Sequence, residues 1–133
     1  PAGEVPFRVD GERTWIRARA EWVHPIRVDQ LATVADVEAA PPQAMGDPGR
    51  YVWAWIDEVA GILRSRYFPT DVGILEDEAT GAAAVLMGHL IARPITIRQG
   101  VGSEIIVRPQ TDGTIEIGGV VELVEVREHA LPR

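Results

Sequence analysis

The amino-acid sequence predicts an α+β protein in which a mixed or antiparallel sheet wraps around a central apolar helix. Short segments that alternate apolar and polar residues recur between glycine- and proline-containing turns, and they indicate six to eight strands. Among them, residues 82–88 have no charge and include three consecutive alanines. A helix that is apolar on nearly every side is buried on all sides. We therefore expect a central helix at about residues 78–92, enclosed by the sheet.

The first strands are predicted to form a hairpin over residues 4–22. Residues 5–9 alternate apolar and polar side chains, the period of a half-buried strand. Asp10 and Gly11 form a turn pair, because glycine adopts positive φ at little cost. Residues 14–22 alternate again and complete the hairpin.

A short helix is predicted at residues 33–39. Thr33 can cap its first turn, and Asp36 follows three residues later, in the reciprocal position of a capping box. Residues 41–49 contain three prolines and two glycines, which indicate a loop.

The middle of the chain predicts a strand pair. In residues 51–57, Tyr51, Trp53 and Trp55 share one face, and the other face is apolar as well. Apolar side chains on both faces favour a central position in the sheet. Residues 58–61 form a turn, and residues 62–68 return as the partner strand.

The last third of the chain repeats the pattern of the first third. Residues 95–100 and 103–109 predict strands, and the Asp112-Gly113 pair predicts a turn. Residues 114–128 then predict one or two further strands. The two ends of the chain share a faint similarity, which is explained either by an internal duplication or by the common use of such turns in sheet proteins.

Composition limits the possible functions. The 133 residues suffice for one domain with a hydrophobic core, and the net charge of −7 argues against nucleic acid or an anionic membrane surface as the main partner. The absence of cysteine excludes disulfides, thiolate catalysis and cysteine-based zinc sites, so a cytoplasmic location is the simplest expectation. The chain begins at Pro1, so we expect a processed product or a piece of a longer protein.

Three acidic residues, Glu76, Asp77 and Glu78, stand just before the apolar helix. The first turn of a helix has unpaired N–H groups and a partial positive charge, so Asp77 or Thr80 could simply cap it. The same N–H groups, from residues 80–83, could instead bind an anionic ligand beside Asp77. The residues alone leave both interpretations open.

Several motifs resemble those of the phenazine-biosynthesis PhzF-like family. "GILEDEATGAAA" (73–84) resembles the family signature G-I/V-x-E-D-P-A-T-G-S-A, and "RSRYF" (64–68) resembles its R-x-F-x-P lead-in. "TIRQGVGSEIIVRP" (96–109) is similar to its Q-G-x-x-x-G-R segment. The resemblance covers nearly the whole chain and is closest between Tyr51 and Gly119.

This resemblance implies a diaminopimelate-epimerase-like fold with two homologous halves and an active site in the cleft between them. Residues 1–24 would be the closing hairpin of a first half that is otherwise absent, and residues 25–133 the second half. The family performs cofactor-free and metal-free acid–base chemistry, in which an acid and a base move one proton on a small carboxylate-bearing metabolite. Asp77 would be the catalytic residue. The resemblance also assigns substrate binding to Glu76, Thr80, Gly81, Ala82, Gln99 and Gly100.

The chain departs from the family pattern at three positions. Glu78 replaces a proline, Ala82 replaces a serine whose hydroxyl meets the substrate, and Ser103 follows Gly102 where an arginine is expected. The family's G-N-P segment, its general-base glutamate and its G-H-P histidine are not among these residues. We therefore expect no turnover from this chain alone.

A second interpretation is a non-catalytic fragment or degenerate module that keeps the fold and self-associates. Either interpretation leads us to expect a homodimer or association with the missing N-terminal half. The three histidines, His24, His89 and His129, have no second ligand at metal-binding spacing, so no metal site is predicted.

Overall fold

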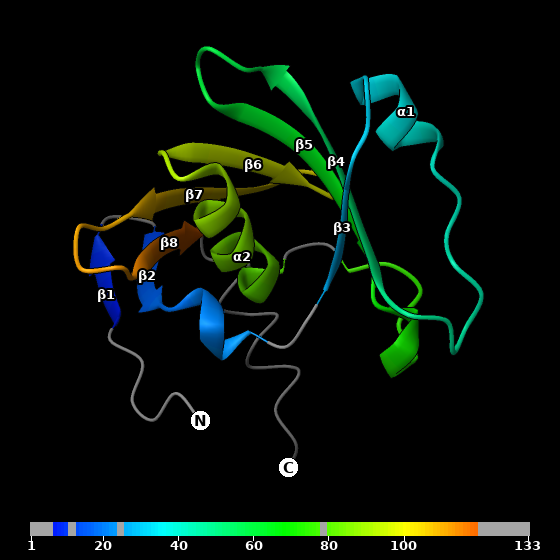
Figure 1. The fold of residues 1–133 in the computed structure, drawn as a ribbon, viewed down its shortest axis with the longest axis horizontal. Helices are drawn as coiled ribbons and strands as arrows, with labels where there is room; N and C mark the ends of the chain where they lie inside the picture. Colours follow the sequence, from blue (N-terminus) through cyan, green and yellow to red (C-terminus); the bar gives the residue numbers. More distant parts are fainter. Residues whose placement is uncertain (1–6, 11–12, 24–25, 78–79, 120–133) are drawn as a thin grey trace.

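In the part of the chain that the structure describes, eight strands form one mixed sheet, with a helix on each of its faces (Figure 1). The computed structural model describes residues 7–10, 13–23, 26–77 and 80–119. Its elements are β1 Phe7–Asp10, β2 Arg13–Ala18, the 3₁₀ turn η1 Ala20–Trp22, β3 Arg27–Gln30, α1 Val34–Ala39, β4 Arg50–Asp57, β5 Ile62–Phe68, the 3₁₀ turn η2 Thr70–Val72, α2 Gly81–Ile91, β6 Ile95–Gln99, β7 Ser103–Pro109 and β8 Ile115–Gly119. The strand order is β1-β2-β8-β7-β6-β5-β4-β3.

The strands pair antiparallel except for β3 with β4 and β5 with β6, which are parallel, so the predicted mixed sheet is confirmed. β1 and β2 form the predicted N-terminal hairpin. β2 ends at Ala18, short of the predicted residue 22, because η1 follows it. β2 also pairs with β8, from Thr14↔Gly119 to Ala18↔Ile115. The hairpin and the C-terminal strands therefore share one sheet, while the division of the chain at residue 24 stays a prediction.

The two faces of the sheet carry separate apolar clusters. Tyr51 and Trp53 of β4 pack in the larger cluster with α2. Val52 and Ala54, the alternate residues of β4, pack instead with Val37 of α1. This explains why both faces of β4 are apolar. The predicted central position is wrong, however, because β4 lies next to the edge strand β3 and has its second face covered by α1.

Helix α2 lies against one face of the sheet, in contact with β7 and β8 (Figure 1). Its buried side consists of Ala83, Ala84, Val85, Met87 and Gly88. The prediction that it is buried on all sides is wrong: Leu90 is 57% exposed, because the sheet covers one side of the helix only. The helix begins at residue 81, and residues 78–79 of the predicted span lie outside the described residues.

Helix α1 begins as the capping-box pattern predicts, since the Thr33 Oγ1 atom accepts a hydrogen bond of 3.1 Å from the backbone N–H of Asp36. β5, β6 and β7 lie where the sequence places them, and β8 covers the first part of the predicted segment 114–128. Residues 120–128 of that segment lie outside the described residues. In the described part of the chain, neither helix has both the length and the apolar character needed to cross a bilayer.

Candidate functional site

Glu76 and Asp77, before α2, lie in an extended stretch of the chain. The backbone N–H of Asp77 donates to the carbonyl of Tyr67 at 2.9 Å, in an isolated antiparallel bridge to β5. Successive side chains of an extended segment point to opposite sides. Glu76 accordingly contacts Arg66 on the α1 face of the sheet, whereas Asp77 contacts Thr80 at the start of α2. Two adjacent acids therefore have two separate environments.

Asp77, Thr80 and Gln99 form a hydrogen-bonded network at the N-terminus of α2. The Thr80 hydroxyl donates to Oδ2 of Asp77 at 2.8 Å. The Gln99 amide nitrogen donates to Thr80 Oγ1 at 2.7 Å and to the backbone carbonyl of Asp77 at 2.9 Å. The Gln99 amide oxygen accepts from the backbone N–H of Thr80 at 3.2 Å. Three of the predicted site residues are thus brought together.

The N-terminus of α2 has an unusual cap. Thr80 occupies the N-cap position with extended φ and ψ, but its side chain makes no capping hydrogen bond to the helix. Its hydroxyl hydrogen is donated to Asp77 instead. Gly81 and Ala82, the next two predicted site residues, are the first two residues of the helix, and Ala82 is exposed. Unpaired N–H groups at such a position favour a negatively charged partner.

Glu76 and Gly100 lie apart from this network. Both line a shallow depression of about 430 Å³ on the α1 face of the sheet, together with Glu38, Arg64 and Arg66. Gly100 has φ of 59° in the turn between β6 and β7, a conformation that glycine adopts without strain. The structure therefore divides the six predicted substrate-binding residues between the two faces of the sheet.

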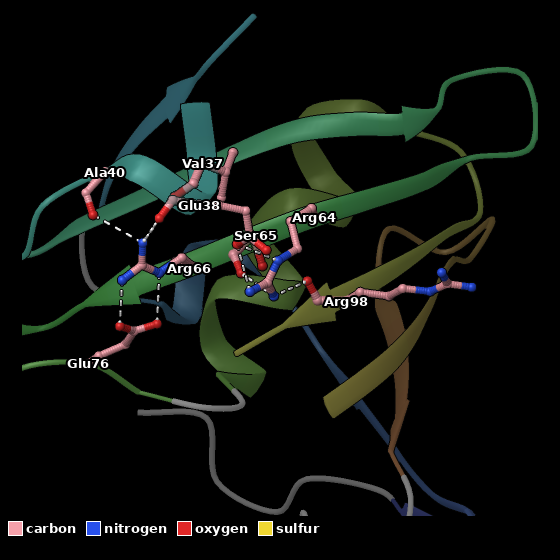
Figure 2. A network of polar contacts seen from close by, with 8 residues as sticks. All are labelled: Val37, Glu38, Ala40, Arg64, Ser65, Arg66, Glu76 and Arg98. Carbon is pink, nitrogen blue, oxygen red and sulfur yellow. Dashed lines mark hydrogen bonds and ion pairs between the residues drawn. The ribbon is translucent and has the colours of Figure 1, made fainter. Parts of the chain in front are cut away.

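Sequence reasoning assigned no role to Arg66, which joins three segments of the chain (Figure 2). Its guanidinium meets the Glu76 carboxylate through two contacts, Nε to Oε2 at 3.0 Å and Nη2 to Oε1 at 2.9 Å. Its Nη1 atom donates to the backbone carbonyls of Val37, Glu38 and Ala40 at 3.1, 2.9 and 3.0 Å. These are carbonyls at the C-terminal end of α1, where a helix leaves carbonyl groups without a full set of partners; that of Val37 also accepts from the backbone N–H of Ala40 at 3.2 Å. Arg66 thereby fastens α1 to the residue that precedes Asp77.

Arg64 lies beside Arg66 on the same face of β5 (Figure 2). It pairs with Glu38 of α1 at 3.0 Å and donates to the backbone carbonyl of Arg98 on β6 at 3.1 Å. The alternation in "RSR", with Ser65 facing the opposite side, could have predicted that both arginines share one face. Their acidic partners are distant in sequence and gave no such signal.

Burial and neighbouring charge change the ionisation of several groups. Burial raises the pKa of the Tyr67 phenol, and the negative charges of Asp71 and Asp77 raise it further. Burial also raises the pKa of the fully buried Tyr51 well above its ordinary value, although the Ser65 hydroxyl partly opposes this effect. The hydrogen bonds to Glu76 raise the pKa of Arg66, against the opposing effect of burial. All three groups are protonated near neutral pH at their ordinary pKa values, and these shifts extend the protonated forms to higher pH.

Comparison with known proteins supports the predicted fold class. No protein-family model matches the sequence. The chain is similar to a crystal structure described as a phenazine biosynthesis PhzC/PhzF protein from Clostridium difficile (strain 630), with a TM-score of 0.61 and 14% sequence identity. The match covers 87% of this chain but 57% of that one, so this chain spans little more than half the length of the similar protein. The fold is therefore PhzF-like, of the diaminopimelate-epimerase-like class that the motifs predicted.

Proposed function

We propose that this chain is the C-terminal portion of a PhzF-like isomerase or epimerase that moves a proton on a small carboxylate-bearing metabolite. The observation that carries the proposal is the network of Asp77, Thr80 and Gln99 at the N-terminus of α2, within a PhzF-like fold. The network holds a carboxylate beside the N–H groups at the start of a helix. A proton donor or acceptor next to an anion-binding position suits this kind of chemistry.

Each site residue has a distinct role in the proposed reaction. The N–H groups of Gly81 and Ala82 bind the substrate carboxylate or a developing enolate, because the start of α2 has a partial positive charge. The carboxylate of Asp77 positions the substrate or exchanges a proton with it. No cofactor or metal takes part in the proposed reaction, and a cytoplasmic location remains our expectation.

The proposed reaction needs a second acid or base opposite Asp77. Among the described residues, no second acid or base forms a hydrogen bond with the Asp77 carboxylate. The partner of this carboxylate is the Thr80 hydroxyl. We expect this group to come from a segment that corresponds to the rest of the similar, longer protein. We therefore expect the complete protein to be active and the 133-residue chain alone to be inactive.

A non-catalytic module that self-associates is the second candidate, and Ala82 favours it. This residue has a methyl group where the PhzF-like signature has a serine hydroxyl, and its side chain is exposed at the start of α2. Such a module is expected to form a homodimer or to bind a separate N-terminal half. Light scattering at tens of micromolar protein that finds a monomer would count against this candidate.

Anthranilate and benzoate, which differ by one amino group, provide a direct test of the ligand site. We expect both to shift the backbone amide resonances of Gly81 and Ala82 in an NMR titration of the 133-residue chain. Asp77→Asn is expected to weaken anthranilate binding about tenfold, because a charged acceptor for the amino group becomes a neutral one. Benzoate binding should not weaken, since benzoate offers Asp77 no donor.

Asp36→Asn serves as the matched control, because it removes the same charge from the first turn of α1. It is expected to leave the binding of both ligands unchanged. The proposal is wrong if neither ligand shifts Gly81 and Ala82, or if the two aspartate variants behave alike. Deuterium incorporation from heavy water into a dihydro-hydroxy-anthranilate-type substrate by the chain alone would contradict the expected inactivity.

A further inference from the structure

Gln99 is a fully engaged polar residue in an otherwise apolar row. On β6, Ile95, Ile97 and Gln99 point to the α2 face of the sheet, and all three are buried. Gln99 is 1% exposed, and both polar atoms of its amide bind the segment around Asp77 and Thr80. A buried amide costs free energy unless it is hydrogen-bonded, so these contacts determine how this side chain is oriented.

The backbone partners fix the orientation of the Gln99 amide. The N–H of Thr80 can only donate, so it must face the amide oxygen, at 3.2 Å. The carbonyl of Asp77 can only accept, so it must face the amide nitrogen, at 2.9 Å. The second hydrogen on that nitrogen then points to Thr80 Oγ1, at 2.7 Å.

This orientation also fixes the direction of the next hydrogen bond. A threonine hydroxyl has one hydrogen to donate. Since Thr80 Oγ1 accepts from Gln99, its hydrogen is available for Oδ2 of Asp77, at 2.8 Å. Within the described part of the chain, no hydrogen-bond donor reaches the other carboxylate oxygen, Oδ1 of Asp77. The two oxygens of the carboxylate are therefore not equivalent.

We propose that Gln99 is a positioning residue that acts through the Thr80 hydroxyl to orient the Asp77 carboxylate, so that Oδ2 is engaged and Oδ1 is offered to a ligand. The orienting role rests on the hydrogen bonds of Gln99, Thr80 and Asp77. The role of Oδ1 rests in addition on the proposed function. Gln99, which the family resemblance assigned to substrate binding, would thus act without touching the substrate.

Four variants separate orientation from simple packing. Gln99→Glu keeps the shape and an acceptor for the Thr80 N–H but loses the donor to Thr80 Oγ1, so the hydroxyl can turn toward the new carboxylate. Gln99→Met keeps the volume and loses every hydrogen bond of the amide. Thr80→Val removes the hydroxyl at nearly constant shape, whereas Thr80→Ser retains it and is expected to restore the wild-type behaviour.

The readout is the side-chain rotamer of Asp77, measured by NMR three-bond couplings from Cγ to the backbone nitrogen and carbonyl carbon. We expect couplings of one rotamer in the wild type and in Thr80→Ser, and averaged couplings in Gln99→Glu, Gln99→Met and Thr80→Val. Circular dichroism identifies the folded variants; if Gln99→Met does not fold, the two shape-conserving variants decide. Unchanged Asp77 couplings in folded Gln99→Glu and Thr80→Val would overturn the proposal.

Titration with anthranilate distinguishes this proposal from the proposed function. If both are right, Gln99→Glu weakens anthranilate binding about tenfold, as Asp77→Asn does. The Asp77 couplings can change in the variants as expected while the wild type binds no anthranilate. This result would support the orienting role of Gln99 and contradict both the proposed function and the ligand role of Oδ1. If Asp77→Asn weakens binding while the rotamer stays unchanged in the Gln99 variants, the proposed function stands and the orienting role falls.

Discussion

Replacement of Arg66 by methionine should destabilise the protein strongly, because this side chain joins three segments at once. The substitution keeps most of the aliphatic length and removes the guanidinium. It therefore removes both contacts with Glu76 and the three contacts with the C-terminal carbonyls of α1. It also removes the contact between the guanidinium and the Phe68 ring, whose centroid lies 4.9 Å away.

The magnitude follows from the partial burial of these groups. Nη1 carries two hydrogens for the three carbonyls, so these contacts amount to two hydrogen bonds of about 0.5–1.5 kcal/mol net each, or about 1–3 kcal/mol together. The ion pair adds about 0.5–1 kcal/mol, since its side chains remain 15% and 27% exposed and water screens them. Water can reach some of the released carbonyls in the variant. We therefore expect a loss of about 2–4 kcal/mol in the free energy of unfolding.

Urea titration followed by tryptophan fluorescence measures this loss, and two further variants sharpen the test. Arg66→Lys keeps the charge but not the planar fork, so it should recover less than half of the loss. Arg98→Met, on the neighbouring strand, is the matched control: its side chain is 53% exposed and its carboxylate partner lies at 3.7 Å, so about 0.5 kcal/mol or less is expected. A loss below about 1 kcal/mol for Arg66→Met, or full recovery by lysine, would refute the reasoning.

Two further predictions concern the core. A Cβ atom at Gly88 would lie 2.7 Å from side-chain atoms of both Val107 and Ile115. Gly88→Ala should therefore lower the free energy of unfolding by about 1–2 kcal/mol, although alanine has the better helix propensity. A variant that is more stable than the wild type in urea titration would contradict the packing of α2. Burial raises the pKa of the Tyr51 phenol above its ordinary value of 10.0. The stability that the protonated phenol contributes is therefore complete below pH 10.0 and decreases at higher pH, by up to about 1.4 kcal/mol per pH unit. Tyr51→Phe should reduce this slope in urea titrations between pH 9 and about pH 11, and equal slopes for both proteins would show that Tyr51 ionises normally in the folded state.

Most of the fold could be predicted because local patterns determine it. Alternation identified β4 to β7, and the cap at Thr33 identified the start of α1. Periodicity could not show which face of α2 meets the sheet, since every residue of the helix except His89 is apolar. The exposure of Leu90 therefore could not be predicted from the sequence, because it depends on how the helix packs against the sheet. The position of β4 beside an edge strand was hidden for a similar reason, because α1 supplies the apolar cover that a central strand would receive from other elements.

The structure brings some of the predicted site residues together and places others apart, and Glu76 shows why. The motif placed Asp77 and Thr80 three residues apart, and the structure joins them directly. Glu76, in contrast, is next to Asp77 in sequence but lies on the other face of the sheet. Sequence proximity indicated a single acidic cluster. The bridge between Asp77 and Tyr67 makes the segment extended, and the pairing of this segment with β5 is not visible in the sequence around Asp77, although β5 itself was predicted.

The same bridge explains why acidic residues gather before an apolar helix. An extended segment that is bridged to Tyr67, near the C-terminal end of β5, presents one acid to each face of the sheet. Glu76 meets Arg66 and so fixes the segment to α1, at a site that favours stability. Asp77 meets Thr80 just before α2, at the site that we propose binds a ligand. Among the described residues, the two acidic side chains have different partners. A change at Glu76 should therefore act through the position of the segment, whereas a change at Asp77 should act on the proposed ligand site.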